Sequence, residues 1–141
     1  MTAYLIDTNV VSELRKPKPH AGAVAWIQSL RLEQGFFSAV TFGEIQRGVE
    51  LTRRSDPAKA NQIEVWAARL EQSSQVLPMD VACFREYARL IHARTNTLAE
   101  DAMIAGTARV HGLTVATRNE RDFAHFGVAV FNPFRYRAPK L

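Results

Sequence analysis

The chain has 141 residues, which suits one domain spanning residues 1–141 and is too short for two ordinary domains. Hydrophobic residues make up 47% of the chain and charged residues 23%, a globular composition that excludes a disordered polymer. Lys and Arg outnumber Asp and Glu by 18 to 14, and the net charge of +4 is compatible with a polyanionic partner as well as with an ordinary basic surface.

The sequence lacks signals for export or membrane insertion. No apolar run is long enough to cross a bilayer, and the first residues show no basic stretch followed by an apolar one. Cys83 is the single cysteine, which excludes an internal disulfide, and its apolar neighbours predict a buried small residue. We therefore expect a cytoplasmic protein with no membrane partner.

Short apolar runs alternate with helical patterns along the chain. The runs predicted to form brief, fully buried strands are Tyr4–Ile6, Gly35–Ser38, Val76–Met79, Leu113–Thr117 and Val128–Phe131. Helical spacing occurs at Val10, Val11 and Leu14; at Ile63, Trp66, Ala67 and Leu70; at Val81, Phe84, Ala88 and Ile91; and at Leu98, Ala102 and Ala105. This alternation predicts an α/β fold with a central, mostly parallel sheet of about five strands flanked by helices.

Several residues mark the ends of these predicted helices. The prolines of Lys16–Pro19 end the first helix, because proline has no amide donor and restricts the preceding residue. Asp56 before Pro57 and Asp80 before Val81 are predicted N-caps. Gly112 is expected just beyond a helix end.

Three acidic residues share a position relative to the predicted sheet. Asp7 directly follows the first strand, Glu44 lies in the first turn of the helix after the second strand, and Asp101 lies in the first turn of a later helix. Ligand sites of parallel α/β sheets form where the chain leaves the carboxyl ends of strands. Converging carboxylates repel one another unless a cation joins them, and oxygen ligands suit Mg²⁺ or Mn²⁺. Zinc is disfavoured because the cysteine and histidines show no ligand spacing.

Helix capping is the competing explanation for the same acids. Thr41–Glu44 and Thr97–Glu100 both match the capping box, and Asp101 would gain from the helix dipole. We interpret Glu100 as a cap, whereas Glu44 and Asp101 stay open between the two roles. The triplet Asp7–Asn9 offers three residues able to cap where one suffices, which indicates a role beyond capping.

At the level of whole motifs, the sequence resembles the PIN-domain ribonucleases, specifically the VapC and FitB-like toxins of bacterial toxin–antitoxin pairs. The blocks that carry the resemblance are Leu5–Leu14, Ser38–Glu44 with Gly48, Leu77–Asp80, Glu100–Ala108, His111–Asn119 and Val128–Phe134. They occur in family order over nearly the whole chain. The sequence shows no dinucleotide-binding, P-loop, serine-hydrolase or zinc-protease motif.

The resemblance implies a parallel sheet flanked by helices, a homodimer, and hydrolysis of RNA phosphodiester bonds with Mg²⁺ or Mn²⁺. It also implies a small cognate antitoxin as protein partner. Asp7, Glu44 and Asp101 match the family's acidic metal-binding positions and are the expected catalytic residues. The positions that match supporting polar residues of the site are Thr8, Asn9, Ser12 and Thr117.

One position departs from the family pattern. Asn119 stands where the last acid often lies, and Asp122, three residues later, is either its replacement or a turn residue. The number of metal ions at the site, one or two, therefore stays open. An alternative function also stays open: a PIN-like module that binds antitoxin or RNA without cutting it. A phosphohydrolase of small molecules is a third alternative. The candidate contacts to the RNA backbone are Arg15, Lys16, Lys18 and Arg47.

Overall fold

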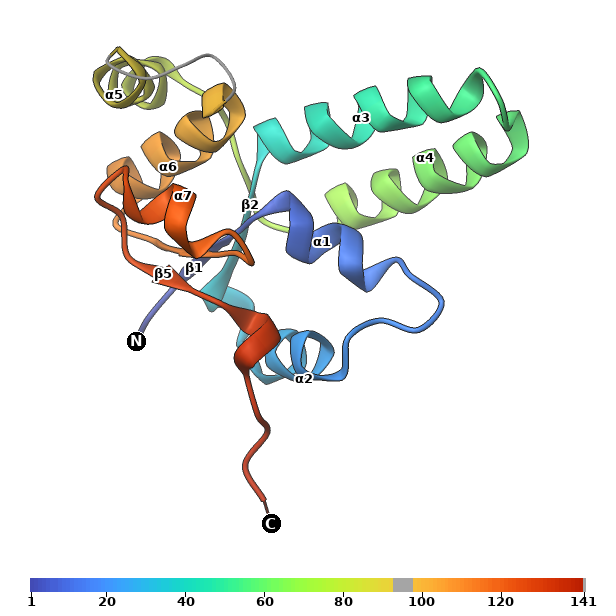
Figure 1. The fold of residues 1–141 in the computed structure, drawn as a ribbon, viewed down its shortest axis with the longest axis horizontal. Coiled ribbons are helices and arrows are strands. Elements are labelled where there is room, and N and C mark those ends of the chain that lie inside the picture. The colour runs from blue at the N-terminus through green and yellow to red at the C-terminus, as the bar shows by residue number, and fades with distance from the viewer. Residues whose placement is uncertain (93–97, 141) are drawn as a thin grey trace.

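Five parallel strands form the centre of the protein, in the spatial order β3-β2-β1-β4-β5 (Figure 1). The computed structural model describes residues 1–92 and 98–140. The strands are β1 (Tyr4–Ile6), β2 (Gly35–Ser38), β3 (Val76–Leu77), β4 (Thr114–Ala116) and β5 (Val130–Phe131). Every neighbouring pair is parallel, which confirms the predicted α/β class and extends "mostly parallel" to all the described strands.

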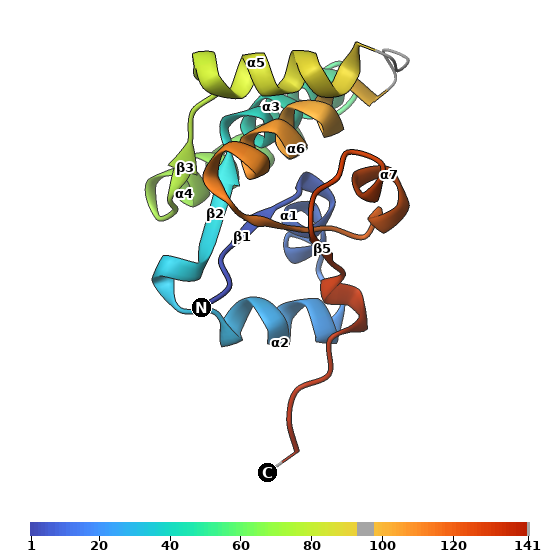
Figure 2. The ribbon, with the colours of Figure 1, turned by 90° about the vertical axis from the view of Figure 1, so that its left-hand side faces the viewer.

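Helices connect the strands and cover both faces of the sheet. They are α1 (Thr8–Leu14), α2 (Ala21–Ser29), α3 (Ala39–Arg53), α4 (Pro57–Gln72), α5 (Val81–Ile91), α6 (Ala99–His111) and α7 (Glu120–Ala124). Short 3₁₀ turns occupy Leu32–Gln34 and Pro133–Arg135. Helices α3 and α4 form an antiparallel hairpin that projects from the sheet, and α5 lies along α6 (Figures 1 and 2). None of the helices in the described ranges is long and apolar enough to cross a bilayer.

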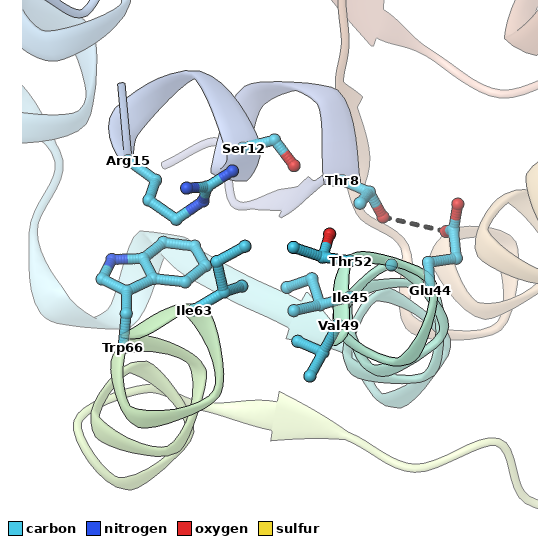
Figure 3. A pocket seen from close by; sticks show the side chains of 10 residues that line it. Thr8, Ser12, Arg15, Glu44, Ile45, Val49, Thr52, Ile63 and Trp66 are labelled. Atoms are coloured by element: carbon cyan, nitrogen blue, oxygen red, sulfur yellow. Dashed lines mark hydrogen bonds between the residues drawn. The ribbon is translucent and has the colours of Figure 1, made fainter. Parts of the chain in front are cut away.

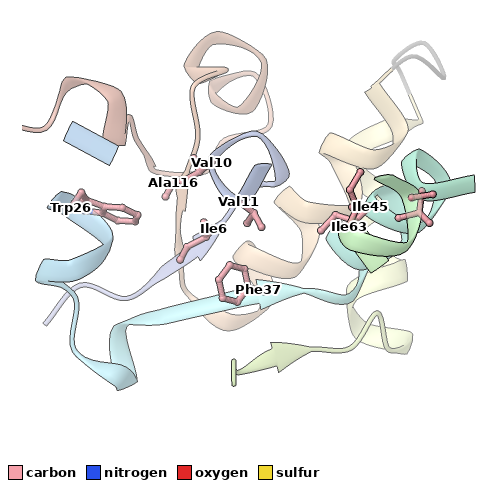
Figure 4. Close-up of a cluster of buried hydrophobic side chains, with 10 residues drawn as sticks. Ile6, Val10, Val11, Trp26, Phe37, Ile45, Ile63 and Ala116 are labelled. Carbon is pink, nitrogen blue, oxygen red and sulfur yellow. The ribbon is translucent and has the colours of Figure 1, made fainter. Parts of the chain in front are cut away.

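Alternate residues of the strands supply two separate cores, because successive side chains of a strand point to opposite faces. On one face Ile6 and Phe37 pack against residues of α1 to α4 (Figure 4). On the other face Leu5 and Val115 pack against α6 and against Phe123 of α7. The result is a three-layer arrangement with the sheet in the middle.

The first two strands have the predicted bounds, whereas the last three are shorter than predicted. β3 ends before Pro78, which lacks the amide needed for another ladder bond. The prediction of full burial is wrong for the first residues of β1, β2 and β4, which are half-buried, and for every residue of β3 and β5. Both are edge strands, so each has a neighbour on only one side.

Most predicted helix ends are confirmed. The Asp56 carboxylate accepts the amide of Lys59 at 3.1 Å and begins α4, and the Asp80 carboxylate accepts the amide of Cys83 at 3.0 Å and begins α5. Gly112 ends α6 in the left-handed conformation, with φ of 66°. Cys83 is fully buried, as predicted.

The predicted capping box at Thr41–Glu44 is wrong. Helix α3 begins three residues earlier, because the Ser38 hydroxyl at the end of β2 accepts the amide of Val40 at 3.1 Å and caps the helix. Glu44 consequently lies in the second turn of α3 rather than the first. Its side chain is therefore free of any capping role.

Candidate active site

The site forms where the strand order reverses, between β1 and its neighbour β4. Asp7 directly follows β1, and Thr117 directly follows β4. The Thr117 hydroxyl donates a 2.8 Å hydrogen bond to Oδ2 of Asp7, and the Asp7 amide donates to the Ala116 carbonyl at 2.9 Å. Such a reversal leaves a crevice at the carboxyl ends of the strands, which is the usual ligand site of open parallel sheets.

Asp7 combines a structural role with an unusual environment. Its Oδ1 accepts the Thr8 amide at 2.8 Å as the N-cap of α1, so capping and the Thr117 bond each use one carboxylate oxygen. The residue is only 4% exposed. Burial raises the pKa of Asp7 above its ordinary value, although the bonds from Thr117 and Thr8 partly offset this effect.

A polar network surrounds the Thr117 hydroxyl. The Asn9 side chain donates to this oxygen at 3.3 Å, and the Asn119 amide donates to it at 2.9 Å. The Oδ1 of Asn9 also accepts the Arg118 amide at 3.2 Å. Asn9 and Thr117, both predicted to support the site, thus tie α1 to the loop between β4 and α7.

Glu44 reaches the same edge of the sheet from α3. The Thr8 hydroxyl donates to Oε1 of Glu44 at 2.9 Å (Figure 3) and lies 3.0 Å from the Thr41 hydroxyl. The pKa of Glu44 is raised to about 7, first by burial, then by a hydrogen bond with Glu100 and the charges of Glu100 and Asp7, while the Thr8 bond lowers it. Glu44 is therefore an acid poised to exchange a proton near neutral pH.

Asp101 lies in the first turn of α6, as predicted. Burial raises its pKa to about 6, with further contributions from the charges of Asp7, Asp122 and Glu100. Glu100, the neighbour of Asp101 in the chain, pairs at 3.2 Å with Arg47, which lies on the same helix as Glu44. The fold therefore brings the predicted acids Asp7, Glu44 and Asp101 to one region of the sheet edge, together with Asp122.

The chemistry of this acidic group fits a hard divalent cation. Its donors are carboxylate oxygens, and their mutual repulsion is a cost that a bound cation would remove. Within residues 1–92 and 98–140, no three His, Cys, Asp or Glu side chains are grouped in a way that could hold a metal ion as they stand. The donor types thus fit Mg²⁺ or Mn²⁺.

Asn119 and Asp122 occupy different places in the α7 region. Asn119 precedes α7 without a side-chain capping bond, and its exposed side chain lines a polar pocket of about 460 Å³. Asp122 lies in the first turn of α7 and lines the same pocket. Of these two residues, only Asp122 contributes a negative charge that acts on Asp101, because the Asn119 amide is neutral.

A pocket of about 180 Å³ beside Glu44 lies between α1 and the α3–α4 hairpin (Figure 3). Thr8, Ser12 and Arg15 of α1 and its C-cap line one side of it. Trp66 of α4 lines the other side and also borders a neighbouring groove of about 680 Å³. Trp66 is half-buried and packs at the edge of the core.

Of the basic residues predicted to contact RNA, two form ion pairs and two have other surroundings. Lys16 pairs with Glu13 at 2.9 Å, and Arg47 pairs with Glu100 at 3.2 Å. Arg15 borders the pocket beside Glu44, and Lys18 is exposed in the loop that joins α1 to α2.

Glu100 is a site residue that sequence reasoning missed. The predicted capping box joins Glu100 to Thr97, which lies outside the described residues. The Glu100 side chain bonds to Glu44 and to Arg47. The available signal was the position of Glu100 directly beside Asp101.

Fold and site together define a parallel α/β domain with converging carboxylates at the reversal of its strand order. The chain belongs to the PIN domain family, whose match spans residues 4–129. Among curated relatives, Toxin FitB of Neisseria gonorrhoeae is 41% identical, with 92% of this chain and 97% of the relative covered. VapC ribonuclease Y4jK of Sinorhizobium fredii is 34% identical, with coverage of 92% and 96%.

Solved structures agree with this assignment. FitAB bound to the IR36 DNA fragment superposes with a TM-score of 0.82 at 34% identity, covering 96% of this chain and 98% of that one. FitAcB from Neisseria gonorrhoeae gives a TM-score of 0.77 at 38% identity, with 94% and 99% covered. The resemblance seen in the sequence motifs, and the fold that it implied, are confirmed.

Proposed function

We propose that this chain is a metal-dependent endoribonuclease that acts as the toxin of a toxin–antitoxin pair. The observation that carries the proposal is the convergence of Asp7, Glu44 and Asp101 at the strand reversal. Relatives named as a toxin and as a ribonuclease, which align over nearly their whole length, support the same function. Such an enzyme would act on RNA in the cytoplasm, in keeping with the single, unpaired Cys83.

In this proposal Asp7 and Asp101 hold Mg²⁺ or Mn²⁺, and Glu44 and Asp122 complete the acidic set. Asp122 is preferred to Asn119 because its charge acts on Asp101. A bound ion would lower the pKa of a water molecule and neutralise charge on the phosphate oxygens.

The remaining steps belong to side chains of the protein. Glu44, with its pKa of about 7, orients the attacking water and accepts its proton. Thr8 fixes the direction of the Glu44 carboxylate through the 2.9 Å bond. Arg15, which lines the pocket beside Ser12, would contact an RNA phosphate, and the exposed Lys18 would extend this positive path. Lys16 and Arg47 would contribute only through the exposed parts of their ion-paired side chains.

The test is cleavage of an RNA pool by the purified chain, followed by sequencing of the fragment ends. Cleavage with Mg²⁺ or Mn²⁺ that stops with EDTA is expected. Absence of metal-dependent cleavage on every RNA tested would overturn the proposal. A comparison with nucleoside monophosphates addresses the phosphohydrolase alternative, because that enzyme would prefer the small substrate.

The second candidate function is binding of RNA or antitoxin without cleavage. Two observations favour it: a neutral Asn119 at the last acidic position, and a carboxylate set that is not grouped for metal binding in the described residues. Tight RNA binding without hydrolysis, at any Mg²⁺ or Mn²⁺ concentration, would establish this function instead.

A small antitoxin is the protein partner expected for a toxin of this kind. The groove of about 680 Å³ beside Arg15 and Trp66 has a partly apolar wall and adjoins the pocket beside Glu44, so a peptide bound there would restrict access to that pocket. Expression of the chain alone is expected to arrest growth. Co-expression of a short neighbouring reading frame should restore growth if it encodes the antitoxin.

We also propose that the chain forms a homodimer through the exposed apolar face of α5. Val81 and Phe84 of α5 are 70% and 48% exposed. An exposed apolar face of this kind can pair with its own copy about a twofold axis. Phe84→Glu is expected to give a monomer in analytical ultracentrifugation, and a dimer that persists would exclude this interface.

A further inference from the structure

Glu13 is a buried acid outside the acidic site. It lies on α1, between the site residue Asn9 and the end of the helix, and its side chain is only 6% exposed. Burying a carboxylate is unfavourable unless hydrogen-bonding or charged partners compensate for the lost water. The side chain has such partners: Lys16 Nζ at 2.9 Å, the His20 amide at 3.0 Å and Arg118 Nη2 at 3.5 Å.

Arg118 connects Glu13 to the loop between β4 and α7. Its guanidinium lies 3.7 Å from the centre of the Phe134 ring, so both the ion pair and the aromatic face orient this side chain. Its backbone amide donates to Oδ1 of Asn9 at 3.2 Å. The two ends of Arg118 therefore attach the loop to α1 at two points, Glu13 and Asn9.

This attachment leads directly to the Asp7 carboxylate. Asn9 and the Asn119 amide hold the Thr117 hydroxyl, and this hydroxyl donates to Oδ2 of Asp7. If the loop moved away from α1, the Thr117 hydroxyl would move with it. Side chains that orient a metal-binding carboxylate commonly affect metal affinity as much as some direct ligands do.

We propose that Glu13 is a positioning residue of the active site: it holds Arg118, and through the β4–α7 loop it keeps Thr117 bonded to Asp7. The inference rests on the proposed metal-dependent function. Glu13 acts at a distance rather than as a ligand, since its carboxylate already bonds to Lys16, the His20 amide and Arg118.

The first test uses Mn²⁺ alone, titrated into the purified chain and followed by calorimetry. Glu13→Gln keeps the size of the side chain and removes its charge, and we expect about tenfold weaker Mn²⁺ binding. Arg118→Met should have the same effect, and the double variant should bind no more weakly than either single one. Wild-type affinity in Glu13→Gln, or fully additive losses in the double variant, would overturn the proposal.

Two matched controls separate positioning from general loss of charge or stability. Glu86→Gln removes another carboxylate that bridges two arginines, Arg89 and Arg109, on the far side of the sheet. Arg69→Met removes an exposed arginine from α4, away from the loop between β4 and α7. Both variants should bind Mn²⁺ as the wild type does.

The second readout does not depend on metal or RNA. Amide hydrogen exchange of Arg118 and Asn119 should become faster in Glu13→Gln, because both amides bond within the network that the loop carries. Unchanged exchange would overturn the positioning role even if the chain bound no metal. Absence of Mn²⁺ binding by the wild type, together with faster exchange in the variant, would instead count against the proposed function alone.

Discussion

The hydroxyl of Thr117 and the carboxylate of Asp7 lie 2.8 Å apart although 110 positions separate them in the chain. Asp7 follows β1 and Thr117 follows β4, and these two strands are neighbours only because the chain returns to the middle of the sheet after building β2 and β3. This bond is one of several that join the segment after β1 to the segment after β4 at the site. Its removal should therefore affect both stability and metal binding.

Thr117→Val keeps the side-chain shape and removes the hydroxyl. We expect a loss of about 1–3 kcal/mol in the free energy of unfolding, because the buried Asp7 carboxylate and the half-buried Asn9 amide each lose a partner. Mn²⁺ affinity should fall by about tenfold. Thr107→Val is the control, since Thr107 is equally buried but bonds to the Met103 carbonyl within α6. Wild-type metal affinity in Thr117→Val would contradict the prediction.

Asp7→Asn should abolish RNA cleavage while leaving the melting temperature within a few degrees of the wild type. Asparagine caps helices about as well as aspartate. The substitution also removes the charge of a buried carboxylate, the pKa of which is already raised by burial. Asp101→Asn is expected to behave alike. Cleavage assays and thermal denaturation check both variants, and undiminished cleavage by either would remove that residue from the proposed metal site.

Stability without metal should fall as the pH rises from about 4 to 7. The pKa values of Glu44 and Asp101 are raised from 4.5 and 3.8 to about 7 and about 6, so in this window the folded state binds more protons than the unfolded state. Glu44→Gln should flatten the dependence measured in EDTA. If the free energy of unfolding of the wild type increased through this window, other titrating groups and not these two acids would determine the pH dependence.

Metal affinity should change with pH in the opposite direction. Deprotonated carboxylates are the ligands, so Mn²⁺ binding should strengthen between about pH 5 and pH 7 as Asp101 and Glu44 lose their protons. Calorimetric titration at several pH values measures this trend. Affinity that is constant over the whole range would indicate that neither acid is a ligand.

Gly106 marks the close contact between α5 and α6. An added Cβ would lie 2.9 Å from the amide nitrogen of Tyr87 and 3.2 Å from the carbonyl oxygen of Cys83. Gly106→Ala should therefore cost about 1–3 kcal/mol in urea denaturation. Gly43→Ala is the matched control, because nothing lies within 4 Å of its Cβ and alanine favours helix by about 0.5–1 kcal/mol.

Local features of the sequence predicted the secondary structure well. The bounds of β1 and β2 and the caps at Asp56 and Asp80 follow from apolar runs and from short-range hydrogen bonding. The beginning of α3 was predicted wrongly, because Ser38 and Thr41 both offer a hydroxyl to a nearby amide. Only the end of β2, which places Ser38 at the turn, decided between them.

The sequence by itself determined the alternation of strands and helices, the family and the identity of the candidate acids, since these depend on residue type and spacing. The tertiary structure alone decided which groups meet: Thr8 with Glu44, Glu100 with Arg47, and Thr117 with Asp7. It also decided that Asp122 acts on Asp101. The physical reason is that burial and charge proximity depend on distances in space, and the strand order β3-β2-β1-β4-β5 brings together segments far apart in the chain.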